Sequence, residues 1–155
     1  EYDEGQANPL PKALRKAPQG IGLGFHVGAT TGLDISYKKG RSVQQAVVGW
    51  NANNNSFRLS ADQLWIFYQH DPEELLHFPV YFGVGGFVFL NNEVDGPFGG
   101  DNYSDNFGIR APVSMAVNHD EVAIDFYVEI VPAISVYPST DFDLLAGVGF
   151  RGYFF

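Results

Sequence analysis

The sequence contains no cysteine and few positively charged residues. The absence of Cys among its 155 residues excludes disulfide bonds, thiolate metal sites and cysteine nucleophiles. Lys and Arg together number 9, against 18 Asp and Glu, which gives a net charge of −9. Phosphate binding needs an excess of Lys and Arg, so we expect no nucleic-acid partner. Charged residues make up only 17% of the chain, below the roughly 25% of an average soluble domain.

Long hydrophobic runs and nucleotide-binding motifs are also missing. No stretch approaches the ~18 uninterrupted apolar residues of a membrane-spanning helix. There is no phosphate loop and no dinucleotide fingerprint, so we expect no nucleotide or redox cofactor. The chain begins at Glu1 without a basic segment followed by an apolar one. The protein is therefore either not exported or has already lost a signal peptide, and the strand pattern favours the second reading.

The sequence is rich in period-two alternation of apolar residues with small or polar ones. This pattern indicates strands with two unlike faces. Residues 1–19 do not alternate and contain Pro9, Pro11 and Pro18, so we expect a flexible N-terminal periplasmic segment. In HDPEELLH (70–77), Asp71 precedes Pro72, which predicts a single helical turn. The remaining chain, 20–155, predicts one all-β domain, an eight-stranded antiparallel up-and-down β-barrel with strands at 20–28, 33–38, 43–50, 58–67, 78–90, 106–117, 122–130 and 142–154.

The small-residue face of these strands indicates the environment of the barrel. Exposed glycine weakens a strand, whereas a narrow lumen needs small residues and charges that can pair. The sequence therefore predicts a transmembrane barrel with its apolar face toward lipid. The alternative is a soluble β-barrel that binds an apolar ligand in a Phe- and Val-lined interior. Two patterns carry the membrane prediction: glycines on the small face (Gly20, Gly22, Gly24, Gly83, Gly85, Gly108, Gly147, Gly149), and aromatic residues near strand ends (Tyr37, Trp50, Trp65, Phe67, Tyr68, Phe78, Tyr103, Tyr137, Phe142, Tyr153, Phe154).

Four segments resemble a known family. They are PVYFGVGGFV (79–88), FGIRAPVSMAV (107–117), FYVEIVPAISVYPSTDFD (126–143) and GVGFRGYFF (147–155). Together they make the chain similar to the small eight-stranded outer-membrane proteins of the OmpA, OmpX and opacity type, and in particular to short OmpA-like barrels. The resemblance implies an integral protein of the bacterial outer membrane, surrounded by outer-membrane lipid and monomeric. It also implies that the C-terminal strand is read by the outer-membrane assembly machinery.

Six charged residues fall on the predicted lumenal face. Arg110, Glu129 and Arg151 lie there on three consecutive strands, and Asp125 is four residues from Glu129 on the same face. A charge in a confined lumen must be paired or hydrated. We therefore expect an Arg110–Glu129–Arg151 ion-pair network balanced by Asp125, Asp62 or Asp34. This network predicts a structural barrel with a narrow, closed lumen. A small-ion pore whose pairing alternates is the functional alternative.

Catalysis and metal binding find little support in the sequence. His26 is expected to meet Asp34 across the first hairpin, and the other three histidines lack metal-ligand spacing. Ser36, Ser60 and Ser114 point to the lumen, with no His two or four residues away. We therefore expect neither a metal site nor an enzyme. An outer-membrane lipid-modifying enzyme with a Ser–His–acid set is the remaining alternative.

Overall fold

The computed structural model describes residues 19–51, 56–73, 76–91, 105–119, 121–137 and 139–154. Apart from Gln19, the expected N-terminal periplasmic segment lies outside the described residues. The described residues contain no helix long and apolar enough to cross a membrane. They form nine strands: β1 (Gly20–Gly28), β2 (Gly32–Lys39), β3 (Ser42–Asn51), β4 (Ser56–Glu73), β5 (Leu76–Asn91), β6 (Asn106–Arg110), β7 (Val113–His119), β8 (Val122–Tyr137) and β9 (Asp141–Phe154).

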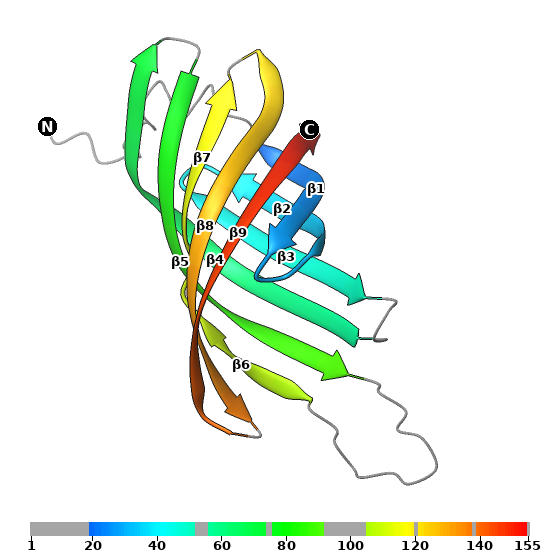
Figure 1. The fold of residues 1–155 in the computed structure, drawn as a ribbon. Helices are drawn as coiled ribbons and strands as arrows, with labels where there is room; N and C mark the ends of the chain where they lie inside the picture. Colours follow the sequence, from blue (N-terminus) through cyan, green and yellow to red (C-terminus); the bar gives the residue numbers. More distant parts are fainter. Residues whose placement is uncertain are drawn as a thin grey trace, which may run out of the picture.

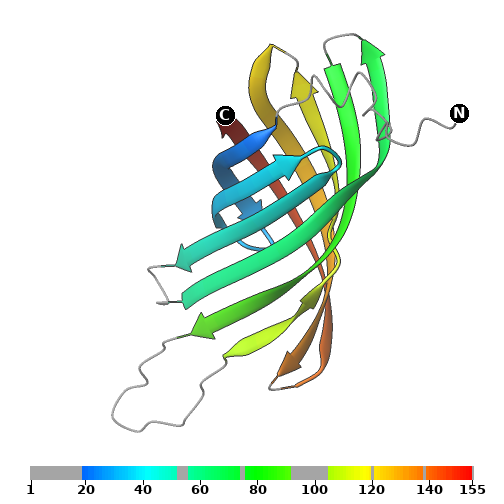
Figure 2. The same ribbon diagram turned by 180° about the vertical axis from the view of Figure 1, so that it is seen from behind.

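The strands form one ring-like antiparallel sheet (Figure 1). Apart from β6 and β7, strands that follow one another in the chain are neighbours in the sheet, and β2 to β5 lie side by side when the ring is seen from behind (Figure 2). Pairing of β1 with β9, from Ile21 opposite Phe154 to Gly28 opposite Gly147, joins the two ends of the chain. The prediction of an all-β antiparallel barrel-like fold is confirmed. We call the end with the β1–β2, β3–β4 and β8–β9 connections the loop end, and the other the terminal end.

The predicted sixth strand is divided in two. Both β6 and β7 pair with β5 on one side and with β8 on the other, so together they occupy one of eight positions around the ring. The break falls at Ala111 and Pro112, and proline has no N–H for the ladder. The two backbone bonds that remain there run from Gly83 N to Pro112 O and from Ala111 N to Pro132 O.

The predicted helical turn at 70–77 is wrong. β4 continues to Glu73 and β5 starts at Leu76, and the pairs include His70 with Phe78 and Glu73 with Leu76. Asp71 therefore caps no helix. The capping signal is local, whereas the extended hairpin gains ladder hydrogen bonds from both long strands.

The outer face of the ring-like sheet is apolar, and its inner face carries the small and polar residues, as the alternation predicts. Along β8, buried and exposed residues alternate, and the exposed positions carry Ile124, Phe126, Val128 and Ile130. Most of the aromatic residues predicted near strand ends point outward. Tyr153 was wrongly placed among them, because it is 5% exposed and shares the inward positions of β9; Tyr103 lies outside the described residues. A buried apolar layer also crosses the interior: Val43, Leu64, Ile66, Tyr81, Ala116 and Tyr127.

Candidate functional site

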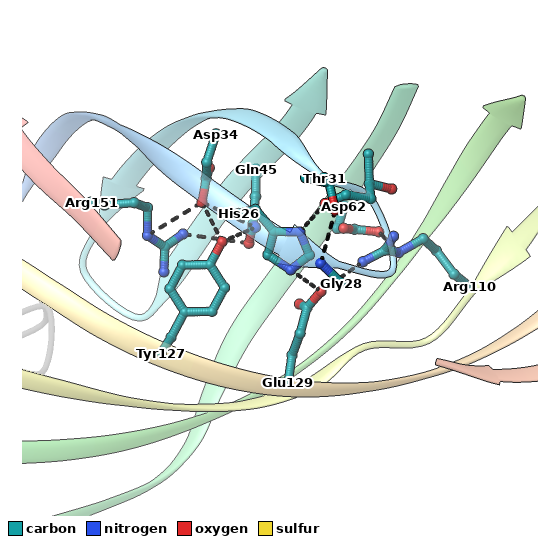
Figure 3. A network of polar contacts seen from close by, with 11 residues as sticks. His26, Gly28, Thr31, Asp34, Gln45, Asp62, Arg110, Tyr127, Glu129 and Arg151 are labelled. Carbon is teal, nitrogen blue, oxygen red and sulfur yellow. Dashed lines mark hydrogen bonds and ion pairs between the residues drawn. The ribbon is translucent and has the colours of Figure 1, made fainter. Parts of the chain in front are cut away.

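All six charged residues predicted for the lumen lie in the interior of the barrel. They come from five different strands, β2, β4, β6, β8 and β9, because inward positions recur at every second residue. Each is at most 6% exposed, so each has exchanged water for protein partners. The residues form two groups along the interior: Asp62, Arg110 and Glu129 in one, and Asp34, Asp125 and Arg151 in the other. Figure 3 shows the first group together with Asp34 and Arg151 of the second.

The first group, which we call the His26 cluster, consists of His26, Asp62, Arg110 and Glu129. Glu129 Oε1 lies 2.8 Å from His26 Nε2 and 3.3 Å from Arg110 Nη2. Arg110 Nε lies 3.0 Å from Asp62 Oδ1, so the guanidinium bridges two carboxylates from opposite sides of the ring. The other ring nitrogen of His26, Nδ1, bonds to the carbonyl oxygen of Thr30 in the β1–β2 connection. The expected His26–Asp34 contact is therefore wrong, since Glu129 takes that place.

The second group, the Arg151 cluster, consists of Asp34, Gln45, Asp125, Tyr127, Arg151 and Tyr153. Arg151 donates through Nε and Nη2 to the two carboxylate oxygens of Asp125, at 3.2 and 3.4 Å. Its Nε also lies 3.8 Å from Asp34 Oδ2. The guanidinium is 4.3 Å from the centre of the Tyr127 ring, a cation–π geometry that adds to the ion pairs.

Neutral side chains add hydrogen bonds to both carboxylates of this cluster. Tyr127 donates to Asp34 Oδ2 at 2.6 Å, and Gln45 Nε2 donates to the same oxygen at 3.3 Å. Tyr153 donates to Asp125 Oδ2 at 3.1 Å. Buried carboxylates are tolerated when charge and hydrogen bonds are both supplied, and here each of them receives both.

The expected network is rearranged in one respect. Arg151 makes its ion pairs with Asp125 and Asp34, whereas the partners of Glu129 are Arg110 and His26. The aromatic rings of His26 and Tyr127 stack with their centres 5.8 Å apart and so connect the two clusters. The polar interior is thus one continuous layer of contacts divided into two sets of ion pairs.

Sequence reasoning missed Gln45, Tyr127, Tyr153 and Lys38 as members of the interior. Lys38 Nζ donates to the hydroxyl of Tyr81 at 2.9 Å toward the terminal end. The signal that identifies them is the alternation of inward and outward residues along each strand. Tyr127 lies midway between Asp125 and Glu129, and Tyr153 follows Arg151 by two residues, so both share the inward face of their charged neighbours.

Two inward glycines of β9 make room for these rings. A Cβ atom added at Gly147 would collide with the imidazole of His26, and one added at Gly149 would collide with the phenol of Tyr127. Both glycines were assigned to the small face on the sequence alone. Their contacts show that the interior is closely packed around the clusters.

A separate polar contact lies at the terminal end, beyond Tyr68, the last outward aromatic residue of β4. Asp71 accepts hydrogen bonds from Gln69 at 2.9 Å and from His77 Nδ1 at 2.6 Å. Burial raises the pKa of Asp71, but these hydrogen bonds and the charges of His77 and His70 outweigh it. The pKa therefore lies below its ordinary value.

The described residues do not assemble a metal or nucleophile site. No group of three or more His, Asp and Glu among them is placed to hold a metal ion. Ser36, Ser60 and Ser114 are buried on the inward face, while His26 contacts Glu129 and the Thr30 carbonyl. What this arrangement can do is neutralise charge and fill the interior.

No protein-family model matches the sequence, and neither a curated protein nor a solved structure shows significant similarity to it.

Proposed function

We propose that the protein is a structural β-barrel of the bacterial outer membrane whose narrow polar lumen is closed by ion pairs. The observation that carries the proposal is the reversed distribution of polarity. Phe126, Phe142 and Leu144 are 62%, 67% and 65% exposed, while Asp125 and Arg151 are 0% and 2% exposed. Water-soluble domains bury apolar side chains and expose charge, whereas a barrel in lipid does the opposite.

The outward face is apolar over most of the ring. Exposed large hydrophobic side chains come from every one of the nine strands. Such a surface in water far exceeds the apolar patches that monomeric soluble proteins tolerate, so hydrocarbon is the solvent that suits it. The Phe and Val residues that a soluble ligand-binding barrel would need inside, such as Phe25, Val128 and Phe150, lie outside.

The interior supports a closed lumen. Arg110 and Arg151 extend inward from β6 and β9, the two neighbours of β8, and each bridges two carboxylates. Nearer the terminal end the apolar layer that includes Leu64 and Tyr81 adds a second obstruction. In this proposal the C-terminal strand, with Phe154 61% exposed, is the segment that the assembly machinery recognises.

Folding into micelles tests the proposal. We expect a compact form that appears only with detergent or lipid and that migrates faster on a gel than the boiled sample. The matched control is the same preparation refolded without detergent, which we expect to aggregate. A monodisperse β-protein in detergent-free buffer would contradict the membrane location, and the ring would then need another partner to cover its outer face.

A further inference from the structure

Four polar atoms in the loop-end half of the interior have no hydrogen-bond partner among the described residues. They are Arg58 Nε, Ser60 Oγ, Thr30 Oγ1 and Asn106 Oδ1. Ser60 and Thr30 are each 1% exposed, so water outside the barrel does not reach their hydroxyl groups. Buried polar groups are nearly always paired, so a set without protein partners must be matched by a bound molecule, an ion or water.

The sheet register brings the four residues together. Gly49, Arg58, Phe89 and Asn106 are successive cross-strand partners on β3, β4, β5 and β6. The Thr30 side chain lies against the Gly49 position, 3.4 Å from where a Cβ would be. Ser60 is the next inward residue of β4 after Arg58. The four residues therefore lie along one side of the interior at the loop end, with Arg58 between the others.

Arg58 is half-buried and differs from the buried arginines, Arg110 and Arg151, in its partners. Arg110 and Arg151 are ion-paired with carboxylates, but Arg58 makes no ion pair in the described part of the chain. Its guanidinium lies over two aromatic rings instead, 5.6 Å from the centre of Phe87 and 5.8 Å from that of Phe89. The rings hold the cation in place and do not neutralise it.

We propose that Arg58, Ser60, Thr30 and Asn106 form a binding site for a small oxyanion, a carboxylate or a phosphate group. The guanidinium supplies the charge and the two hydroxyls supply further donors. The amide of Asn106 can turn to present its NH₂. A carboxylate on a flat or apolar molecule would also contact Phe87 and Phe89. The site goes beyond the proposed membrane role and does not depend on it.

Titration of the isotope-labelled full chain, in non-ionic detergent or in whichever solvent folds it, tests the proposal. The Nε–H resonance of Arg58 is followed while inorganic phosphate is added, and in a second sample while benzoate is added. We expect a saturable shift with at least one of them. Saturation by phosphate alone identifies a phosphate site, and saturation by benzoate identifies a carboxylate site. Without saturation by either anion, the atoms are hydrated by water and the proposal is wrong.

Variants separate this site from general charge effects. Arg58→Gln should lower the affinity for the anion that saturates by at least about tenfold, and Ser60→Ala should lower it several-fold. Arg41→Gln is the matched control, because Arg41 is exposed in the turn between β2 and β3 at the terminal end of the barrel. The affinity of this variant for the anion should equal that of the parent. Equal affinity in Arg58→Gln would overturn the assignment. If Arg58→Gln does not fold, Ser60→Ala provides the test, and an anion affinity of Ser60→Ala equal to that of the parent overturns the assignment of the site.

Discussion

At the scale of single residues, the interior depends on carboxylates that serve more than one cation. Glu129 contacts both His26 and Arg110, and Asp62 contacts Arg110 from the other side. Removing one partner of a buried ion pair costs more than the pair contributes, because a charge is left without compensation. Glu129 is therefore the residue where a single substitution disturbs the most contacts of the His26 cluster.

Glu129→Ala should destabilise the barrel. His26 loses its carboxylate, and Arg110 keeps only Asp62, so we expect a loss of about 3 kcal/mol in the free energy of unfolding. The measurement is urea unfolding in lipid vesicles, with Glu129→Gln as the control that keeps the volume and an acceptor oxygen. We expect Glu129→Gln to be affected less. An unfolding midpoint of Glu129→Ala equal to that of the parent would contradict the role given to this carboxylate.

Asp71 should make stability depend on pH at the terminal end. Its pKa is lower in the folded than in the unfolded chain, so its ionised form stabilises the fold above the unfolded pKa of about 4. That contribution is lost as the pH falls through the lower, folded pKa. The side chain is 35% exposed, so solvent screening keeps the effect small.

The measurement for Asp71 is the unfolding midpoint of the parent and of Asp71→Asn across the acidic range. The parent should be the more stable of the two near neutral pH, and the difference should shrink to nothing in strong acid. A constant difference at every pH would show that the carboxylate charge is irrelevant and that only the hydrogen bonds matter.

At the scale of single residues, the sequence predicts which side chains enter the interior but not how they pair. Parity along each strand placed all six charged residues inside, because an inward residue recurs at every second position. It did not determine which of them pair. The pairing of Arg151 with Asp125 and of Glu129 with His26 depends on the stagger between strands, and a shift of two residues would keep the parity while changing every partner.

At the scale of elements, β8 shows the division between the two faces most clearly. Its outward residues Phe126, Val128 and Ile130 alternate with inward Tyr127 and Glu129. Period two was readable in the sequence along most of the strand. The ends of the elements were less predictable. The extension of β4 through residues 70–73 depends on pairing with β5, which local composition does not specify, whereas the break at Pro112 coincides with a residue that cannot donate to the ladder.

Val128→Arg tests the outward face of β8. A cation placed toward lipid near the middle of a strand should cost about 2–4 kcal/mol in the free energy of unfolding from vesicles. Ser139→Arg introduces the same charge at an exposed position of the β8–β9 connection and should cost far less. The decisive quantity is the difference between the two variants. If they unfold alike, the outward face of β8 does not contact hydrocarbon.

At the scale of the whole molecule, closure of the ring makes the interior a separate compartment. The β1–β9 pairing seals the wall, and the polar contacts then extend from β2 across to β8 and β9. The contacts join segments that are far apart in the chain, as for Asp34 and Tyr127, which are separated by 93 positions. Sequence patterns predict the individual strands, but closure of the ring determines which inward side chains come into contact.

A closed interior should not conduct ions. We expect the parent, reconstituted in a planar lipid bilayer, to show no steady current, because Arg110 bridges two carboxylates and the Tyr127 ring stacks on His26 and lies against Arg151. Replacing both side chains, Arg110→Ala with Tyr127→Ala, should open the charged layer and thin the apolar layer, of which Tyr127 is also a member, and so produce measurable current. The double variant Lys39→Ala with Tyr37→Ala, at exposed positions of β2, is the control and should remain silent. Steady conductance of the parent at the level of the double variant would mean that the ion pairs line an open pore, as the small-ion alternative requires.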